Sequence, residues 1–344
     1  MELKIKNKKE NDTITLLNAE MNSFFSSYKP FVFATTLKKR EVENSYPAPI
    51  EFEINDFSSN KNAYLFFISN NKDFKDFKKY HFDSSSFFID NLYPGLTYYC
   101  KVKNITTNQE SNILSFKTKN SPRTLRIDGV KNVRDIGGSK IGNEHIKLGK
   151  VYRGANLDEI SKEGKEQFSS LGIKTIIDLR EKNYRKKTLN NVNYIDLPDS
   201  GGPCYAKGDL SILKTELQKS LALEIKTFAN EDNYPIYFHC QIGRDRTGTL
   251  SFILKGLLGV SYEELIKDYE LSFFSTCGTS DYRDTLGHDL KESIESLYNF
   301  FLEKDKEKNK KNPTLKEGIE LFLLEIGVSK KEISSIKKIM LGTK

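Results

Sequence analysis

Two hydrophobic patterns meet near residue 240 of this 344-residue chain. Residues 234–239 form an aromatic and β-branched run, which is typical of a short buried strand. Half of the positions in residues 247–258 are Leu, Ile or Phe and most of the others are small, over a length that suits a helix, which predicts a largely buried helix. The residues between these two elements therefore form a loop that leads from a strand end into a helix N-terminus.

The first third of the chain has a different pattern, in which short apolar runs alternate with clusters of turn residues. Four of these runs have the composition of strands, at residues 50–54, 63–68, 86–89 and 113–118. A further strand-like piece at residues 13–16 has no assigned place. The pattern predicts a β-sandwich from about residue 30 to residue 119, followed by a linker at residues 121–123.

Residues 92–102 (LYPGLTYYCKV) contain a Pro-Gly turn just before a Tyr-rich strand. They resemble the Leu-x-Pro-Gly-x-x-Tyr corner of fibronectin type III domains, where the Tyr hydroxyl braces the turn into the next strand. The resemblance implies a small all-β sandwich within residues 1–120 and a second domain over residues 121–344. The module has no catalytic constellation. We therefore expect it to bind a protein or surface, to shape the entrance of the second domain, or to act only as a packing partner.

The loop between the predicted strand and helix, residues 239–248 (HCQIGRDRTG), has a Cys followed six positions later by an Arg. A helix N-terminus attracts anions, because unpaired backbone N–H groups and the positive end of the helix dipole converge there. Gly243 lets the loop close tightly so that its amides converge. The amides and nearby cations favour the thiolate of Cys240. A thiolate in an anion cradle is suited to attack on a phosphate ester.

Three neighbours of Cys240 fit the same chemistry. Arg246 is a planar, permanently charged donor that can hold two phosphoryl oxygens while charge spreads in the transition state. The Thr247 hydroxyl is expected near the sulfur, where it would help the thiolate leave when a phosphocysteine is hydrolysed. His239 is expected to orient the loop rather than to bind a metal, since no second ligand is spaced to join it. We therefore predict catalysis without a metal or cofactor.

The leaving oxygen needs a proton, and the sequence offers carboxyl groups at two places. Asp245 lies within the loop itself. Asp196 and Asp199 lie in residues 194–202 (YIDLPDSGG), a strand that runs into a Pro/Gly loop of the kind that often carries catalytic groups. Any of them would act as general acid toward the leaving oxygen and then as base toward water. The residues alone leave the choice open.

The loop resembles the His-Cys-x-x-Gly-Lys-Asp-Arg-Thr-Gly signature of the bacterial tyrosine-phosphatase-like family of cysteine-dependent phosphatases. Five other segments resemble motifs of that family in the same order, at residues 132–138 (NVRDIGG), 151–157, 176–180 (IIDLR), 268–272 (DYELS) and 326–333. The resemblance covers the chain from about residue 125 to the end. It implies an α/β cysteine-phosphatase fold, with a central sheet flanked by helices, after the all-β module.

The resemblance also implies roles for residues. Cys240 would be the nucleophile, Arg246 the phosphate clamp and Asp245 the general acid. Classical tyrosine phosphatases take their acid from a Trp-Pro-Asp loop, and this chain has no Trp, which favours Asp245 over Asp199. The remaining loop residues are expected to contact the substrate: Gln241, Ile242, Gly243, Arg244 and Thr247.

The charged residues of the matched motifs have two possible roles, since they could support the phosphate pocket or form structural ion pairs at strand ends. Together with His239 and Asp199, these supporting candidates are Arg134, Asp135, Asp178 and Arg180. Arg244 stands where the family has Lys. The charge is kept, but a compact ammonium becomes a planar fork.

Composition narrows the class of protein. The net charge of +7 comes largely from scattered Lys and does not indicate nucleic-acid binding. No apolar run approaches the length of a membrane-spanning helix. The four Cys residues have neither metal-site spacing nor a disulfide framework. Residues 1–10 lack an apolar signal core, so we expect a cytoplasmic protein, or a secreted or cell-surface one if a signal peptide was trimmed.

The sequence as a whole predicts a protein-tyrosine-phosphatase-like phosphomonoesterase that forms a phosphocysteine, with dual specificity left open. A phosphorylated protein carrying phosphotyrosine is the first expected substrate. A phosphoinositide or an inositol phosphate is the alternative, because Arg244 beside Arg246 suits a highly charged head group. A non-catalytic phosphate-binding module is the second alternative. Sulfur transfer by a rhodanese-like loop is disfavoured by residues 245–247 and by the motif at residues 132–138.

Overall fold

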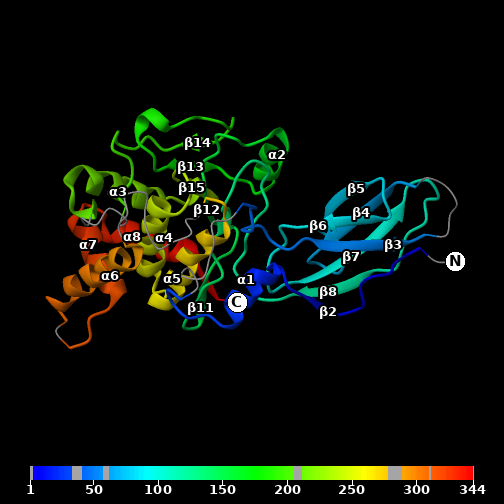
Figure 1. Ribbon diagram of the computed structural model, residues 1–344, viewed down its shortest axis with the longest axis horizontal. Helices are drawn as coiled ribbons and strands as arrows, with labels where there is room; N and C mark the ends of the chain where they lie inside the picture. The colour runs from blue at the N-terminus through cyan, green and yellow to red at the C-terminus, as the bar shows by residue number, and fades with distance from the viewer. Residues whose placement is uncertain are drawn as a thin grey trace. The chain divides into compact units, whose positions relative to one another are not determined.

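The computed structural model describes residues 3–32, 41–56, 62–204, 211–277, 289–309 and 311–343 (Figure 1). The chain divides into two units. The first consists of Met1–Asn22 and Pro47–Arg123, and the second of Ser23–Tyr46 and Thr124–Lys344. The chain therefore leaves the first unit after Asn22, contributes a segment to the second, and returns to the first at Pro47.

The first unit contains two sheets. Strands pair in the order β2-β8-β7-β4-β5 in one sheet and β1-β3-β6 in the other. The strands of the first sheet are β2 (Asp12–Ile14), β4 (Tyr64–Ser69), β5 (Lys78–Phe82), β7 (Thr97–Asn104) and β8 (Leu114–Thr118). Those of the second are β1 (Lys4–Ile5), β3 (Ile50–Asn55) and β6 (Ser86–Ile89). The four strands predicted at residues 50–54, 63–68, 86–89 and 113–118 are confirmed to within a few residues, and the unplaced piece at residues 13–16 contributes to β2.

Residues from both sheets share one hydrophobic core. The Phe52 ring of β3 lies 4.7 Å from the Phe66 ring of β4, measured between centroids, and Phe66 lies 5.0 Å from Phe87 of β6. Alternate residues of β7 are buried, as expected of strands with one face on a core. At the corner before β7, the Tyr98 hydroxyl accepts a hydrogen bond from the Tyr93 amide over 2.9 Å. The predicted brace of this turn is therefore present.

The second unit is organised around a five-stranded sheet with the order β14-β13-β15-β12-β9. Its strands are β9 (Arg134–Asp135), β12 (Val151–Gly154), β13 (Thr175–Asp178), β14 (Asn193–Tyr194) and β15 (Ile236–His239). All neighbours pair in parallel except β9, which is antiparallel to β12. The central strand β15 is buried at all four positions, which explains why its sequence is a continuous apolar run rather than an alternating one.

Helices and a small sheet complete the second unit. The helices are α1 (Ala19–Ser26, which begins in the first unit), α2 (Lys162–Ser170), α3 (Thr215–Thr227), α4 (Asp245–Leu258), α5 (Tyr262–Glu270), α6 (Leu290–Lys306), α7 (Leu315–Glu325) and α8 (Lys330–Met340). Short 3₁₀ turns are η2 (Lys182–Tyr184), η4 (Ser211–Leu213), η5 (Glu231–Asn233) and η6 (Leu271–Phe274). The small sheet joins β10 (Lys140–Ile141), β11 (Glu144–Ile146) and β16 (Leu341–Thr343). Within the described ranges, no helix has both the length and the apolar character needed to cross a membrane.

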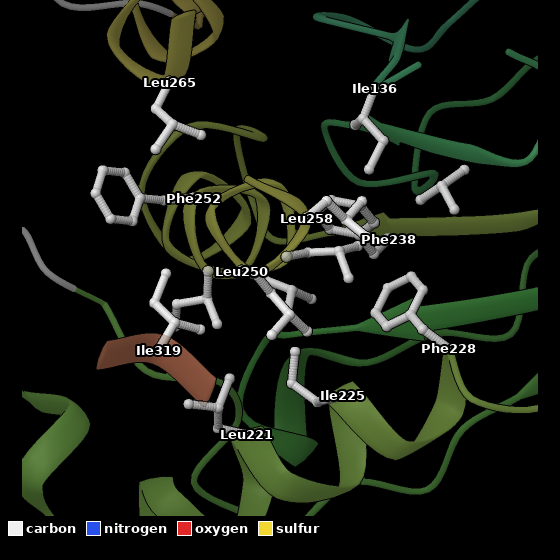
Figure 2. Packing of buried hydrophobic residues seen from close by; sticks show 14 of the residues in the cluster. Ile136, Leu221, Ile225, Phe228, Phe238, Leu250, Phe252, Leu258, Leu265 and Ile319 are labelled. Atoms are coloured by element: carbon white, nitrogen blue, oxygen red, sulfur yellow. The ribbon is translucent and has the colours of Figure 1, made fainter. Parts of the chain in front are cut away.

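Helix α4 forms the centre of the main core (Figure 2). Every residue from Thr247 to Leu258 is buried, which confirms the prediction of a buried helix over residues 247–258. Figure 2 shows Phe252 and Leu258 on different sides of this helix, with side chains of other elements around them. Burying one such side chain stabilises the fold by roughly 1.5–3 kcal/mol. The helix ends at Gly259, whose φ of +96° suits a left-handed cap. This core fixes the N-terminus of α4 against the end of β15.

Candidate active site

Cys240 directly follows the central strand β15, and α4 begins at Asp245 after the intervening loop. His239, the last residue of β15, is in register with Gly154 at the end of β12 and with Asp178 at the end of β13. The carboxyl ends of three parallel strands therefore meet beside the loop. Only 4% of the surface of Cys240 is exposed. The predicted strand-loop-helix junction is present, and it places Cys240 near a helix N-terminus, where anions bind.

Gly243 is required by the backbone of the loop. Its φ is +72°, and a Cβ atom there would lie 2.3 Å from the carbonyl carbon of Gly154 in β12. An L-residue would therefore be strained twice, by its φ and by contact with a rigid strand. The close approach keeps the loop folded against the end of β12.

Two side chains hold the carbonyl groups of the loop from behind. Asn132 Nδ2 donates to the carbonyls of Ile242 (3.2 Å) and Gly243 (3.1 Å). Arg153 Nη2 donates to the Gly243 carbonyl over 2.9 Å. In a trans peptide the N–H points away from the preceding C=O. Fixing these carbonyls therefore turns the following amides toward the opposite side, where an anion would be cradled.

A buried ion network supports Arg153. Asp268 of α5 accepts from Arg153 Nη1 (2.6 Å) and Arg134 Nε (3.1 Å), and also from the Ser251 hydroxyl (2.9 Å). Burial alone would raise the pKa of Asp268, but the charges of Lys255, Arg153 and Arg134 outweigh it and hold that pKa well below its usual range. Arg134 thus contacts the network behind the loop.

Arg246 lies in the first turn of α4 and forms an ion pair with Glu181. The distance between Arg246 Nη2 and Glu181 Oε1 is 2.5 Å, and 19% of the Arg246 side chain is exposed. The pair fixes one edge of the guanidinium, which limits the orientations that it adopts. Glu181 directly follows Arg180, so the end of β13 and the start of α4 are joined here.

The carboxylate of Asp245 faces its neighbour Arg244. Its two oxygens accept from Arg244 Nε (2.8 Å) and Nη2 (3.2 Å). The Arg244 side chain is 1% exposed and that of Asp245 is 18% exposed. Arg244 therefore lies in the interior and contacts Asp245, while Asp245 retains some access to solvent. The expectation that Arg244 contacts the substrate stays a prediction, as does the acid role of Asp245.

The other candidate acids lie on the surface. The Asp199 side chain is 78% exposed and forms an ion pair with Lys182 at 3.1 Å. Asp196 is also exposed. The loop that contains Asp199 is nevertheless attached to the end of β13, because Arg185 Nη2 donates to the Pro198 carbonyl over 2.6 Å and Gly202 N donates to the Leu179 carbonyl over 3.0 Å.

Arg180 connects three carboxyl or amide groups beside the loop. Its guanidinium donates to Asp178 (2.7 Å) and Asp158 (2.8 Å), and more weakly to the Gln241 side-chain oxygen (3.4 Å). Burial would lower the pKa of Arg180, but the hydrogen bonds to both carboxylates outweigh it and raise the pKa. His239 Nδ1 lies 3.8 Å from Asp178 Oδ1. Burial lowers the pKa of the His239 imidazole, which favours its neutral form.

Two further predicted residues have contrasting surroundings. Thr247 is fully buried, and its hydroxyl has no hydrogen-bond partner within the described ranges. Asp135 accepts from the amides of Gly137 (2.9 Å) and Gly149 (2.6 Å), so those contacts brace a turn beyond β9 rather than the loop.

The sequence reasoning did not single out several residues of this site. Asn132 and Arg153 lie in matched motifs, yet their contacts with loop carbonyls were not expected. Asp268 also lies in such a motif, whereas Asp158 does not and Glu181 was not assigned a role. The signal available for Asn132, Arg153 and Asp268 was that each lies in a segment that resembles a motif of the family.

Comparison with known proteins identifies relatives of the second unit. The model of the Tyrosine phosphatase family matches residues 125–342. A provisionally named tyrosine-protein phosphatase of Cupriavidus necator is 24% identical over 171 residues, which is 42% of this chain and 61% of that protein. A tyrosine-protein phosphatase of Nostoc commune is 25% identical over 143 residues, covering 35% of this chain and 47% of the relative. The match thus spans only about half to three-fifths of each relative.

Among solved structures, the chain is similar to the core catalytic domain of a PP-IP phosphatase from S. cerevisiae, determined in complex with citrate. The sequences are 19% identical, and the match covers 46% of this chain and 88% of that one with a TM-score of 0.31.

Proposed function

The chain belongs to the tyrosine phosphatase family, and from this premise we propose that it hydrolyses phosphate monoesters through a phosphocysteine on Cys240. One observation carries the proposal. Cys240 lies at the carboxyl end of β15, and the loop after it leads into α4, whose first turn contains Arg246. This arrangement supports the proposal, because a thiol, the amides of a helix N-terminus and a cation all belong to one strand-loop-helix junction.

The proposed reaction has two steps. The Cys240 thiolate attacks phosphorus, the bond to the ester oxygen breaks, and that oxygen takes a proton from a general acid. Water then attacks the phosphocysteine, the same carboxylate takes a proton from the water, and the thiolate leaves. In both steps Arg246 and the loop amides stabilise the equatorial oxygens. The Thr247 hydroxyl, which is buried without a hydrogen-bond partner within the described ranges, is proposed to donate to the departing sulfur.

Asp245 is our proposed general acid. Its side chain retains 18% exposure, although both oxygens accept from the Arg244 guanidinium. Asp199 is kept as the alternative because its loop is tied to the end of β13. In this proposal Gln241, Ile242 and Gly243 contact the phosphate through their amides, and Arg180, Asp178 and His239 support the loop.

The decisive experiment is hydrolysis of p-nitrophenyl phosphate by the full chain and by Cys240→Ser. We expect the wild type to be active and the variant to lose at least about 10³-fold of this activity. Rapid acid quench during turnover should trap a phosphoenzyme on the wild type and none on the variant. A Cys240→Ser chain with full activity would exclude the phosphocysteine. Phosphate binding without turnover in the wild type would favour the non-catalytic phosphate-binding module instead.

Phosphotyrosine in a protein is our first proposed substrate, and dual specificity for phosphoserine and phosphothreonine belongs to the same proposal. A second candidate is a phosphoinositide or inositol phosphate, favoured by the lysines next to Glu181. Lys182 and Lys186 are 67% and 65% exposed on the segment that begins with the partner of Arg246. These cations would contact additional phosphates of a head group.

A substrate panel with the Lys182→Ala/Lys186→Ala double variant distinguishes the two classes. If the head group is the substrate, the variant loses activity on phosphoinositides and inositol phosphates while its activity on p-nitrophenyl phosphate is retained. Equal activity of variant and wild type on all multiply phosphorylated substrates would leave phosphotyrosine peptides as the favoured class. Lys165→Ala, on the exposed face of α2, serves as the matched control.

For the first unit we propose a fibronectin type III-like sandwich. The shared core of its two sheets and the Tyr98–Tyr93 hydrogen bond support this proposal. We predict that this module binds a protein or surface. Deleting residues 1–120 would not test this prediction cleanly, because the deletion would also remove residues 23–46, which belong to the second unit. Point substitutions on its exposed strands are the appropriate probe.

A further inference from the structure

A segment from the first third of the chain belongs to the phosphatase unit. Residues 23–46 cluster with that unit, although strands of the first unit precede and follow them in sequence. The Phe24 ring lies 5.5 Å from the Phe274 ring of η6, and the Tyr28 hydroxyl donates to the Glu270 carboxylate over 2.6 Å. The first part of the segment is thus attached to α5 and η6.

In the second part of the segment, the carboxylate of Glu43 joins two stretches of chain. One oxygen of Glu43 accepts from the Ser275 hydroxyl (2.9 Å) and from the amide and hydroxyl of Thr276 (both 3.0 Å). Its other oxygen accepts from the amide and hydroxyl of Ser45. The Asn44 amide adds a bond to the Phe274 carbonyl at 3.0 Å. Glu43 therefore fixes Ser45 relative to the residues that follow η6.

Ser45 in turn contacts the residue that holds the loop. It is 3% exposed, and its hydroxyl oxygen accepts from the backbone amide of Asn132 over 3.2 Å. Asn132 adopts a φ of +58°, a left-handed conformation that Asn tolerates better than most non-Gly residues. Its side chain donates to the carbonyls of the loop that follows Cys240. A continuous hydrogen-bonded path thus runs from Glu43 through Ser45 and Asn132 to the loop.

We propose that Ser45 and Glu43 are positioning residues of the phosphatase site. Arg134 Nη1 already donates to the Asn132 side-chain oxygen over 2.6 Å, and Ser45 and Glu43 add to this by fixing the Asn132 backbone. Together these contacts orient the Asn132 amide group against the loop carbonyls and so preorganise the anion cradle. The inference rests on the proposed function of the loop. It also extends the phosphatase unit, since a chain that starts at residue 121 would lack these two residues.

The test is made on the full chain with Ser45→Ala, and with Glu43→Gln as a second variant. Affinity for tungstate, a tetrahedral oxyanion, is measured by titration calorimetry, together with kcat/KM on p-nitrophenyl phosphate and the Tm. A hydrogen bond of this kind contributes about 1 kcal/mol, so we expect its loss to weaken tungstate binding by up to roughly 5-fold, with a similar fall in kcat/KM. Tyr28→Phe, which removes one hydroxyl from the same segment away from the loop, should leave tungstate affinity unchanged.

A double-mutant cycle separates positioning from general stabilisation. Asn132→Gly keeps the left-handed backbone and removes the side chain through which Ser45 acts, so adding Ser45→Ala to it should weaken tungstate binding little further. Three results would overturn the inference: unchanged tungstate affinity in Ser45→Ala and Glu43→Gln, a fall in Tm without loss of affinity, or an equal loss in the Asn132→Gly background. A wild type that binds tungstate but does not turn over would refute the proposed function alone. A wild type that binds none would refute both.

Discussion

The Arg246 guanidinium and the Glu181 carboxylate form an ion pair with a 2.5 Å contact between Nη2 and Oε1. The pair connects the first turn of α4 with the residue that follows Arg180, so two elements that flank the loop share it. Because Arg246 is 19% and Glu181 37% exposed, the pair adds little to the free energy of folding. Its larger effect is expected on the orientation of Arg246.

We predict that Glu181→Gln lowers kcat/KM on p-nitrophenyl phosphate by about 5- to 20-fold. Without its ion pair the Arg246 guanidinium is less ordered, so it loses more conformational entropy when it binds phosphate. The Tm should change by no more than a few degrees. Steady-state kinetics and thermal unfolding provide both values. Glu163→Gln, an exposed residue of α2, is the control. An unchanged kcat/KM in Glu181→Gln would show that Arg246 is positioned by other contacts.

The identity of the general acid predicts a dependence on the leaving group. Asp245→Asn should lower kcat by 10²-fold or more for alkyl phosphates, whose leaving oxygens need a proton, and by much less for p-nitrophenyl phosphate. Asp199→Asn should change neither rate if Asp245 is the acid. Rates for a series of aryl and alkyl phosphates would measure this slope. A uniform loss for all leaving groups would assign Asp245 a structural role beside Arg244, and Asp199 would become the candidate.

The central strand and helix of the site were predictable because few of their positions are charged. β15 and α4 are enclosed on all sides, so residues 234–239 are almost continuously apolar, and residues 247–258 consist of large apolar and small residues apart from Lys255. The Cys-x5-Arg spacing then indicated the chemistry of the loop between them. The family resemblance was needed to expect the surrounding sheet, whose edge strands β9 and β14 have only two residues each.

The groups that hold the loop could not be paired from the sequence. Arg134 and Asp268 are separated by 134 positions, and Arg153 and Asp268 by 115, so no local pattern relates them. The placement of residues 23–46 was missed for a similar reason. Phe24 and Tyr28 are ordinary aromatic residues in sequence, and nothing in their spacing specifies that their partners lie in α5 and η6.

The close approach of Gly243 to β12 predicts a severe effect of a single methyl group. A Cβ at residue 243 would lie 2.3 Å from the Gly154 carbonyl carbon and 2.6 Å from the Ala155 amide nitrogen. Because both neighbours are strand-end backbone, the loop must move in Gly243→Ala. We expect kcat/KM to fall at least about 10²-fold and tungstate binding to weaken in parallel. Gly172→Ala, also at positive φ but with open space around it, controls for backbone strain alone.

Glu224 of α3 predicts how stability changes with pH. It is fully buried, its Oε1 accepts from the Ser220 hydroxyl at 3.1 Å, and its Oε2 has no partner within the described ranges. Desolvation raises its pKa to about 8, although Arg185 and Arg246 act in the opposite direction. Native Glu224 therefore keeps its proton in a range where the unfolded chain, with a pKa near ~4.3, has lost it.

Since the native state binds more protons in this window, the free energy of unfolding should fall as pH rises from about 4.3 to about 8. Glu224→Gln removes the titration, so its stability relative to the wild type should improve across that window by a few kcal/mol, an order-of-magnitude value. Any fixed effect of burying an amide cancels in the comparison between pH values. Urea unfolding at pH 5, 6.5 and 8 would measure the difference, with exposed Glu216→Gln on the same helix as control. Parallel stability curves for wild type and Glu224→Gln would show that Glu224 is ionised in the native state and that the two arginines outweigh its desolvation.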